Sequence, residues 1–282
     1  MTLNKGVLYV VATPIGNLGD FTDRAKQVLS EVDVIAAEDT RTTGKLLNYL
    51  GLKKTMMPYH EHNETRQLEV IETKLSQGQS IALVSDAGTP LISDPGYPLV
   101  NQLLSKDFRV IPIPGPSAII TALSVSGIAT DRFTFEGFLP SKATARLSKL
   151  KALVNEPRTM VFYESCHRIA ACLDDFKKVF ENDRKITVCR ELTKKFETIA
   201  SGTTAELCQW VQQSQQQKGE FVLVVSGQST AVDNDLLSAQ PILETLLSYL
   251  APSQAAAATA QITGLKKKPL YQLALSLQED LQ

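Results

Sequence analysis

Apolar runs of strand length alternate with amphipathic segments through the first part of the chain. The runs LYVVAT (8–13), VDVIAAE (32–38) and SIALV (80–84) are rich in apolar and β-branched residues, which is typical of buried strands. Strands that alternate with helices form a parallel sheet that the helices cover, so we expect a parallel α/β fold here. The other expected elements are helices at 22–32, 41–50, 65–77 and 97–104, a strand at 108–113, and a helix that opens at Pro116.

From about Asp131 the pattern becomes denser in strands. This density predicts a second α/β unit, built on a mixed sheet. Thr203 and Glu206 have the spacing of a capping box, which predicts a helix start. The polar segment 212–219 (QQSQQQKG) is expected to be a flexible loop. The five expected strands lie at 132–140, 158–164, 185–192, 197–203 and 221–227, with helices at 142–153, 168–180 and 203–213.

The last fifty or so residues have a wholly helical pattern, after a linker at 229–236 (STAVDNDL). Two helices flank Thr263-Gly264, an arrangement typical of a helix-turn-helix in which the second helix lies against nucleic acid. Leu265, Tyr271 and Leu275 are expected to point into the core. Lys266, Lys267 and Lys268 start the second helix, as a basic patch or as a solvated helix start. The expected domains are 1–118, 119–228 and 229–282.

The composition is that of a soluble globular protein, with 43% hydrophobic and 21% charged residues among 282. A net charge of −1 excludes a broadly basic body, so any nucleic-acid binding has to come from a local patch. The four cysteines have no C-x-x-C or zinc spacing, which indicates unpaired thiols in a reducing cytoplasm. Prolines interrupt the longest uncharged run, 110–130, so we expect no membrane segment.

Irregular segments follow four of the expected parallel strands. The carboxyl ends of parallel strands lie at one edge of a sheet, so these loops should gather there, where ligands bind. Glycine lets a backbone approach a ligand and aspartate supplies acceptors, although the same residues also build long turns. Ser117 either meets a ligand or caps a helix. The four loops are TPIGNLGD (13–20), EDTRTTG (38–44), SDAGTP (85–90) within SDAGTPLISDPG (85–96), and PGPSA (114–118).

Two other patterns bear on chemistry. His60 and His62, as alternate residues of one strand face, supply only two imidazoles, whereas zinc sites use three or four ligands. We therefore expect no metal, and favour a loop or substrate contact. Charged residues at the strand ends of 38–41, 162–168 and 189–198 suggest a cleft between the two α/β domains. The bases available there for a phosphate backbone are Arg41, Arg168, Arg190, Lys194 and Lys195.

Taken together, the motifs TPIGNLGDFTDRA, AAEDTR, ALVSDAGTPLISDPG, PGPSA, FYESCHR, RELTKKFET and KGEFVLVV resemble the tetrapyrrole methylase superfamily. More narrowly, they resemble its ribosomal RNA small subunit methyltransferase I family, from about Leu8 to Val225. The resemblance implies two α/β domains, parallel sheet then mixed sheet, with S-adenosyl-L-methionine in the cleft between them, and a small C-terminal helical domain. It implies methylation of a cytidine ribose 2′-hydroxyl in small-subunit (16S) rRNA by a homodimer. The first loop, 13–17, keeps a single glycine, unlike the wider superfamily, which disfavours a tetrapyrrole substrate.

The resemblance also implies site residues. Asp86 and the backbone around Gly88 and Thr89 contact the cofactor. Glu164 as general base and Lys194 as its electrostatic partner are a hypothesis based on their place at strand ends. The alternatives are a tetrapyrrole C-methyltransferase and a non-catalytic regulator that binds a nucleotide or RNA. The remaining pocket residues implied are Pro14, Ile15, Ser117, Ala118, Phe162 and Leu192.

Overall fold

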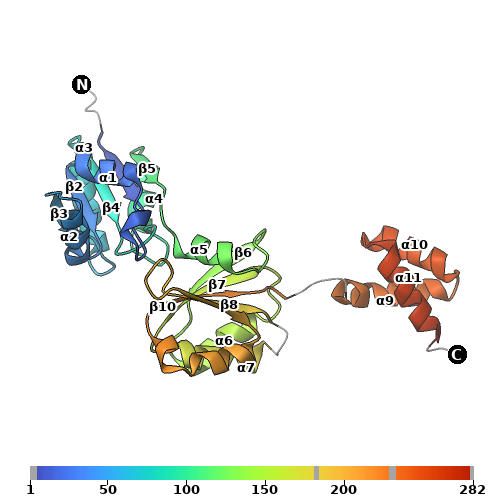
Figure 1. Ribbon diagram of the computed structural model, residues 1–282. Helices are drawn as coiled ribbons and strands as arrows, with labels where there is room; N and C mark the ends of the chain where they lie inside the picture. The colour runs from blue at the N-terminus through green and yellow to red at the C-terminus, as the bar shows by residue number, and fades with distance from the viewer. Residues whose placement is uncertain (1–4, 181–183, 229–232, 280–282) are drawn as a thin grey trace. The chain divides into compact units, whose positions relative to one another are not determined.

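The computed structural model describes residues 5–180, 184–228 and 233–279. These residues separate into two compact units (Figure 1). The first unit comprises the chain up to residue 154 and residues 158–226, and it contains both sheets. The second unit comprises residues 155–157 and the chain from residue 227 onward, and its secondary structure is helical.

The first sheet is parallel throughout, as the alternating pattern predicted. Its strand order is β3-β2-β4-β1-β5. The edge strand β3 did not stand out in the sequence because its residues, TMMP, are exposed or only partly buried, whereas β2 and β4 of the same length are fully buried apolar runs. The strands are β1 (Val7–Val11), β2 (Val34–Ala37), β3 (Thr55–Pro58), β4 (Ile81–Val84) and β5 (Arg109–Ile113).

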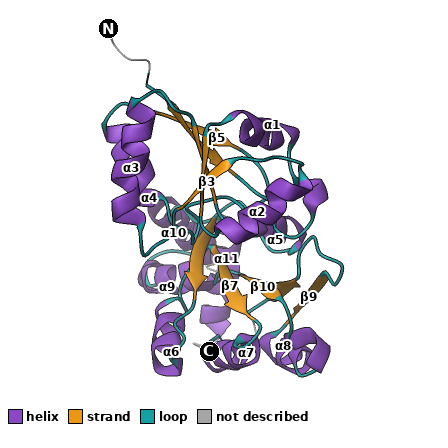
Figure 2. Ribbon diagram, turned by 90° about the vertical axis from the view of Figure 1, so that its left-hand side faces the viewer, coloured by secondary structure: helices purple, strands orange, loops and turns teal. Residues whose placement is uncertain are grey.

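Helices cover both faces of this sheet (Figure 2). Alternate side chains of β1 point to opposite faces, so Leu8 packs in the core beneath α3 and α4 while Val11 packs beneath α1 and α2. Burial of both faces explains why the central strands are almost continuously apolar. The helices are α1 (Asp23–Glu31), α2 (Thr40–Tyr49), α3 (Glu64–Ser76) and α4 (Tyr97–Ser105), and a short 3-10 turn, η1, covers Leu18–Asp20.

The second sheet is mixed, as predicted, with strand order β6-β7-β10-β8-β9. The pair β6/β7 is parallel, whereas β7/β10, β10/β8 and β8/β9 are antiparallel. Each of the five strands lies at a segment that the sequence predicted. They are β6 (Phe133–Phe138), β7 (Thr159–Ser165), β8 (Ile186–Arg190), β9 (Thr198–Gly202) and β10 (Glu220–Val225).

One face of this sheet packs against α6 (Ala143–Ala152), α7 (Ile169–Val179) and α8 (Thr204–Val211). The capping box of Thr203 and Glu206 at the start of α8 is confirmed. The other face packs against α5 (Ala118–Val125).

One boundary prediction in this unit was wrong. The helix α5 begins at Ala118 rather than at Pro116, because the chain is still extended at Ser117, its N-cap. The expected flexible loop at 212–219 contains a 3-10 turn, η2, at Ser214–Gln217.

The second unit consists of α9 (Asp233–Leu247), α10 (Pro252–Thr263) and α11 (Lys267–Glu279), which confirms the helical tail. Gly264 ends α10 in the left-handed conformation, at φ +75°. Of the expected linker, residues 229–232 lie outside the described residues, and α9 begins at Asp233.

The predicted orientation of α11 was partly wrong. Its buried positions are Leu270 and Ala274, which pack in small cores with α9 and α10. Tyr271 and Leu275, which were expected in the core, are 39% and 40% exposed because each follows a buried residue by one position. Leu265 is partly buried, as expected. The outward face of α11 therefore combines aromatic, aliphatic and basic side chains.

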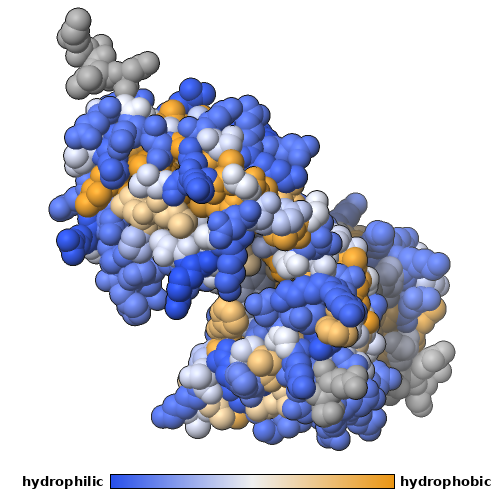
Figure 3. All heavy atoms as spheres, turned by 60° about the vertical axis from the view of Figure 1, so that its left-hand side comes forward, coloured by the Kyte–Doolittle hydropathy of each residue, from blue (hydrophilic) through white to orange (hydrophobic). Residues whose placement is uncertain are grey.

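Two further properties follow from the described parts of the chain. Cys166, Cys172, Cys189 and Cys208 are all free thiols, as expected. Among the described residues, the helices are too short or too polar to span a bilayer. Hydrophilic residues cover most of the face in Figure 3, and hydrophobic residues form separate patches on it.

Candidate active site

The loops that follow β1, β4 and β5 are joined at one edge of the first sheet. The N–H of Thr13 donates to the carbonyl of Gly88 at 2.8 Å, and the N–H of Gly88 donates back at 3.0 Å. The hydroxyl of Thr89 donates to the carbonyl of Pro116 at 3.2 Å. The predicted gathering of these loops is therefore confirmed. Hydrogen bonds to backbone carbonyls connect the three loops at the middle of this sheet edge.

The loop after β2 adds acidic groups to the same edge. The N–H of Asp39 donates to Asp86 Oδ1 at 3.2 Å, and the N–H of Asp86 donates to Glu38 Oε2 at 3.1 Å. Burial raises the pKa of both Glu38 and Asp86. Hydrogen bonds from Arg41 lower the pKa of Asp39 to about 2. The edge thus concentrates negative charge, and the guanidinium of Arg41 pairs with Asp39 there.

A cavity of about 420 Å³ lies between these loops and the second sheet, within the first unit. Such a volume falls within the usual range of small-molecule sites, roughly 300–1,000 Å³. Pro14 borders a smaller hollow of about 230 Å³ with Asp86, and Phe162 is buried in the core on the helix-covered face. The sequence-predicted residues that line the larger cavity are Ile15, Gly88, Thr89, Ser117, Ala118, Glu164 and Leu192.

The backbone of the loop at 85–96 explains its unusual composition. Gly88 has φ +82°, and a Cβ there would lie 3.4 Å from Ile15 Cγ2. Leu91 and Ser93 also have positive φ, at 74° and 65°, which costs of order 1–3 kcal/mol per residue. At its far end, the N–H of Gly96 donates to the Glu64 carboxylate at 2.9 Å. The loop is therefore an ordered and strained wall rather than a plain turn.

Ser117 distinguishes the two interpretations of PGPSA. It is the N-cap residue of α5, but its side chain makes no capping hydrogen bond. The hydroxyl is instead free to meet a ligand, because Ser117 lines the cavity. The alternative of simple capping is not realised.

Asp94, the second aspartate of SDAGTPLISDPG, lines the cavity and was not singled out from the sequence. Burial raises its pKa to about 6, and the charges of Glu38 and Asp86 add to the rise while a hydrogen bond with Ser85 opposes it. Tyr163 lines the same cavity, and burial together with the charge of Asp94 raises its pKa to about 12. A carboxylate with a pKa near neutrality is suited to proton transfer.

Glu164 has a different environment from the one that the base hypothesis requires. Its side chain is 0% exposed, and its Oε1 atom accepts from Arg168 at 2.7 Å and from the N–H of Ser165 at 2.7 Å. It follows Tyr163 on β7 and so shares the helix-covered face with Phe162, near Cys172, whose pKa is raised by burial and by Glu164. This ion pair favours a structural role for Glu164 over proton transfer.

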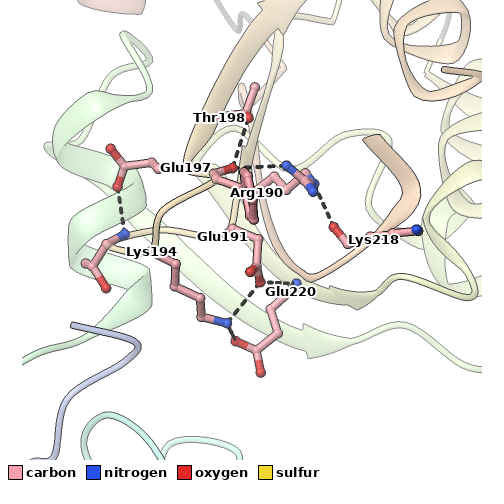
Figure 4. A network of polar contacts seen from close by, with 9 residues as sticks. Arg190, Glu191, Lys194, Glu197, Thr198, Lys218 and Glu220 are labelled. Atoms are coloured by element: carbon pink, nitrogen blue, oxygen red, sulfur yellow. Dashed lines mark hydrogen bonds and ion pairs between the residues drawn. The ribbon is translucent and has the colours of Figure 1, made fainter. Parts of the chain in front are cut away.

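Lys194 is also paired within the protein (Figure 4). It does not line the cavity. Its Nζ atom lies 2.9 Å from Glu191 and 2.6 Å from Glu220. Burial alone would lower the pKa of Lys194, but the hydrogen bonds with Glu220 and Glu191 outweigh it and raise the pKa. Lys194 therefore stays protonated and holds its loop.

The loop after β8 is fixed by a network of polar contacts (Figure 4). Glu191 and Thr193 have positive φ, at 51° and 66°, on either side of Leu192. The N–H of Glu220 donates to Glu191 at 3.0 Å, and the N–H of Thr193 donates to Glu197 at 2.7 Å. These bonds offset the backbone strain and hold Leu192 in the cavity wall.

The arginines expected to meet phosphate are largely occupied. Arg190 is buried and donates to the carbonyls of Lys218 at 2.6 Å and Phe196 at 3.0 Å. Arg168 pairs with Glu164. The guanidinium of Arg41 and the ammonium of Lys195 belong to exposed side chains.

His60 and His62 lie in the turn between β3 and α3, in agreement with the favoured loop interpretation rather than with a position on one strand face. Their ring centroids are 6.0 Å apart, and Asn63 Nδ2 lies 3.1 Å from His60 Nε2. Within the described ranges, no group of three or more histidine, cysteine, aspartate or glutamate side chains has the arrangement of a metal site.

Comparison with known proteins agrees with this architecture. The family model of tetrapyrrole (corrin/porphyrin) methylases matches residues 7–208, and that of the RsmI C-terminal HTH domain matches residues 233–278. Among solved structures, a uroporphyrin-III-C-methyltransferase from Thermus thermophilus has a TM-score of 0.55 at 18% identity, covering 79% of this chain and 94% of its own. The methyltransferase CobJ has a TM-score of 0.58 at 17% identity, covering 80% and 96%. At these identities the likeness concerns the fold.

Closer relatives carry a single name, ribosomal RNA small subunit methyltransferase I. The protein of Haemophilus influenzae is 49% identical over 98% of this chain and 99% of its own length. The protein of Xylella fastidiosa strain Temecula1 is 51% identical over 94% and 98%, and that of Escherichia coli O157:H7 is 48% identical over 98% and 96%. The chain therefore belongs to the ribosomal RNA small subunit methyltransferase I family of the tetrapyrrole methylases.

Proposed function

We propose that this protein is an S-adenosyl-L-methionine-dependent methyltransferase that modifies the ribose 2′-hydroxyl of a cytidine in small-subunit (16S) rRNA. The observation that carries the proposal is the cavity in which six of the nine predicted cofactor residues meet the Asp94 carboxylate. The names of the close relatives support an rRNA substrate. The cytidine, the 2′-oxygen, the homodimer and the cytoplasmic location follow from the family resemblance.

The residues of the cavity fit the cofactor. When bound, S-adenosyl-L-methionine supplies a methyl group that is already activated on a positively charged sulfur. The Asp94 carboxylate at the cavity favours a cation in a site of reduced dielectric. The uncapped hydroxyl of Ser117 and the backbone around Gly88 and Thr89 supply polar contacts, and Ile15, Ala118 and Leu192 supply apolar ones.

We assign proton removal from the ribose hydroxyl to Asp94 rather than to Glu164. Asp94 is in the cavity, and its carboxylate is not held in an ion pair with a basic side chain in the described chain. Glu164 is held by Arg168, and Lys194 is held by Glu191 and Glu220. In this assignment Glu164 pairs with Arg168 beside the cavity and Lys194 holds the loop after β8, and a positioned base contributes typically ~10²–10⁴-fold to the rate.

The second unit is proposed to bind the rRNA. Lys266, Lys267 and Lys268 are exposed at the start of α11, although α11 itself begins at Lys267. Tyr271 and Leu275 lie on the exposed side of the same helix. A helix face that carries cations and an aromatic ring provides phosphate contacts and a surface for bases. The local basic patch that the near-neutral net charge requires is therefore at this helix.

A tetrapyrrole C-methyltransferase is the second candidate, because the neighbours in fold include a uroporphyrin-III-C-methyltransferase. The deciding experiment measures transfer of labelled methyl from S-adenosyl-L-methionine to small ribosomal subunits from cells that lack this protein. Labelled 2′-O-methylcytidine after digestion to nucleosides is the expected product. Transfer to uroporphyrin III alone supports the second candidate, and cofactor binding with no transfer to any substrate supports a regulator.

A further inference from the structure

An aromatic side chain at the cavity has no role in the cofactor site described above. Phe138, the last residue of β6, lines the cavity and is 55% exposed. Its ring lies edge-on to Tyr163, with centroids 5.6 Å apart and an angle of 61° between the planes. Phe135 holds Tyr163 in the same way, at 4.9 Å and 66°. The Phe138 ring is thus partly exposed to the cavity, and it packs against Tyr163, which Phe135 also contacts.

A β-bulge aims Phe138 at the cavity. In a regular strand, residues 135 and 138 point to opposite faces because their spacing is odd. The register of β6 against β7 shifts between Phe135 and Gly137, and Gly137 has φ +67°. The extra residue brings Phe135 and Phe138 to the same face, where both contact Tyr163. Bulges beside active sites commonly redirect a side chain in this way.

The carboxyl end of β6 is also fixed by a hydrogen bond from Arg168. The carbonyl of Leu139, next to Phe138, accepts from Arg168 at 3.0 Å. Arg168 is in turn paired with the buried Glu164 carboxylate at 2.7 Å. The ion pair that removes Glu164 from proton transfer therefore fixes the position from which Phe138 projects.

The strand order separates Phe138 from the cofactor residues of the second sheet. Leu192 follows β8, whereas Phe138 ends β6, and β7 and β10 lie between these two strands. Three strand spacings amount to ~14 Å. The cavity thus extends along the sheet from Leu192 at the β8 end, where Ile15 and Ala118 also pack, to Phe138 at the β6 end, which leaves room for two groups side by side.

We propose that Phe138 is a stacking platform for an unpaired nucleobase of the RNA substrate, beside the cofactor. This proposal rests on the proposed function. Every base has a π-face, so the platform orients the nucleotide without selecting its identity. Enzymes that act on nucleotides commonly hold a displaced base against aromatic or apolar side chains. Stacking on Phe138 brings the ribose of that nucleotide near Asp94, because the loop of Asp94 lies beside this end of β6: a Cβ at Gly137 would be 3.8 Å from Ser93 Oγ.

The test compares Phe138→Leu and Phe138→Trp with the wild type, and uses Phe133→Leu as the control. Phe133 is another exposed phenylalanine of β6, and it does not line the cavity. Small ribosomal subunits from cells lacking the protein are the substrate. The measurements are kcat and KM for the subunits, subunit binding in the presence of S-adenosylhomocysteine, and the affinity for S-adenosylhomocysteine alone.

Phe138→Leu should lower kcat/KM for subunits by about 5- to 150-fold, the range for loss of one base stack. Phe138→Trp should have a kcat/KM at least equal to that of the wild type, because tryptophan also offers a ring for stacking. Phe133→Leu should keep the wild-type kcat/KM, and the affinity for S-adenosylhomocysteine should be the same in all variants. If the wild type is active and Phe138→Leu has unchanged kinetics, the stacking platform is overturned but the proposed function is not. An equal loss of S-adenosylhomocysteine affinity also overturns it, because Phe138 is then a cofactor wall. A wild type that neither methylates nor binds subunits overturns the proposed function and the platform together.

Discussion

The carbon chain of Lys194 occupies the space next to Gly16 that a side chain would need. A Cβ at Gly16 would lie 2.5 Å from Lys194 Cγ and 2.8 Å from its Cε. The two residues belong to the loops after β8 and after β1, so this contact joins a wall of the second sheet to a loop of the first. Lys194 accordingly acts through its position, with its charge balanced by Glu191 and Glu220.

Substitution of Gly16 by alanine should therefore destabilise the protein and weaken cofactor binding. Displacing a packed side chain costs typically ~1–3 kcal/mol, in addition to the strain at φ +150°. Gly51→Ala is the matched control, because Gly51 also has a positive φ but a Cβ there would have no atom within 4 Å. Chemical denaturation and titration with S-adenosylhomocysteine measure both effects. Equal losses in the two variants would show that the contact with Lys194 has no energetic weight.

Asp94→Asn should lower the rate of methyl transfer by about 10²–10⁴-fold if Asp94 accepts the proton. The wild-type rate should fall as the pH drops below about 6, because protonated Asp94 cannot accept a proton. The asparagine variant should lack that dependence. Single-turnover rates between pH 5 and 8, with bound cofactor, provide the measurement.

The same substitution has an opposite effect on stability. The pKa of Asp94 in the folded protein, about 6, is above its usual value of 3.8, so its ionisation destabilises the fold as the pH rises through this window. Asp94→Asn should therefore be at least as stable as the wild type at pH 7.5. A large loss of stability in this variant would indicate a structural rather than a catalytic role.

Arg168→Ala should be strongly destabilising, because it leaves the buried Glu164 carboxylate without its partner. Breaking a buried ion pair typically costs roughly 3–5 kcal/mol. Arg41→Ala removes an ion pair whose arginine side chain is 87% exposed, and such pairs contribute at most about 1 kcal/mol. Urea denaturation of both variants measures the difference.

Glu164→Gln should keep the rate of methyl transfer within about tenfold of the wild-type rate, because Glu164 is held in an ion pair. A loss as large as that of Asp94→Asn would restore Glu164 as the base.

Replacement of Lys266, Lys267 and Lys268 by alanine should weaken binding to small subunits and reduce its dependence on salt. Each lost phosphate contact lowers the slope of log K against log salt by ~0.7–0.9. The control variant replaces Lys53, Lys151 and Lys177, which are exposed in the first unit and carry the same total charge. Filter binding at several salt concentrations gives the slopes, and the affinity for S-adenosylhomocysteine should not change. Identical slopes in the two variants would reject a role of α11 in RNA binding.

Periodicity predicted most of the fold because the burial of each element is reflected in its local sequence. The central strands of the first sheet are apolar on both faces, and the second sheet shows five separate runs, so both sheets could be identified before their pairing was known. The phase of α11 could not, because Leu270 and Leu275 are equally apolar, and only the packing of Leu270 and Ala274 decides between faces.

The candidate site was less predictable, for reasons of backbone geometry. Alternation along β7 points the Tyr163 ring into the cavity and the Glu164 side chain toward the helix-covered face, so that Glu164 borders the cavity only at its edge, which a strand-end position alone does not reveal. Asp94 reaches the cavity through a loop whose positive φ angles at Leu91 and Ser93 have no clear sequence signal, because neither residue favours them. The bulge before Gly137 likewise reverses the face expected of Phe138.

The contact between Gly16 and Lys194 has a consequence for the order in which the protein is made. Its two loops are separated by most of the first unit, and the last strand of the cavity, β10, comes later still. During synthesis the first sheet emerges and folds before its opposing wall exists, since domains generally fold as units from the N-terminus. A nascent chain therefore has no complete cofactor cavity until residues 219–222 have left the ribosome tunnel.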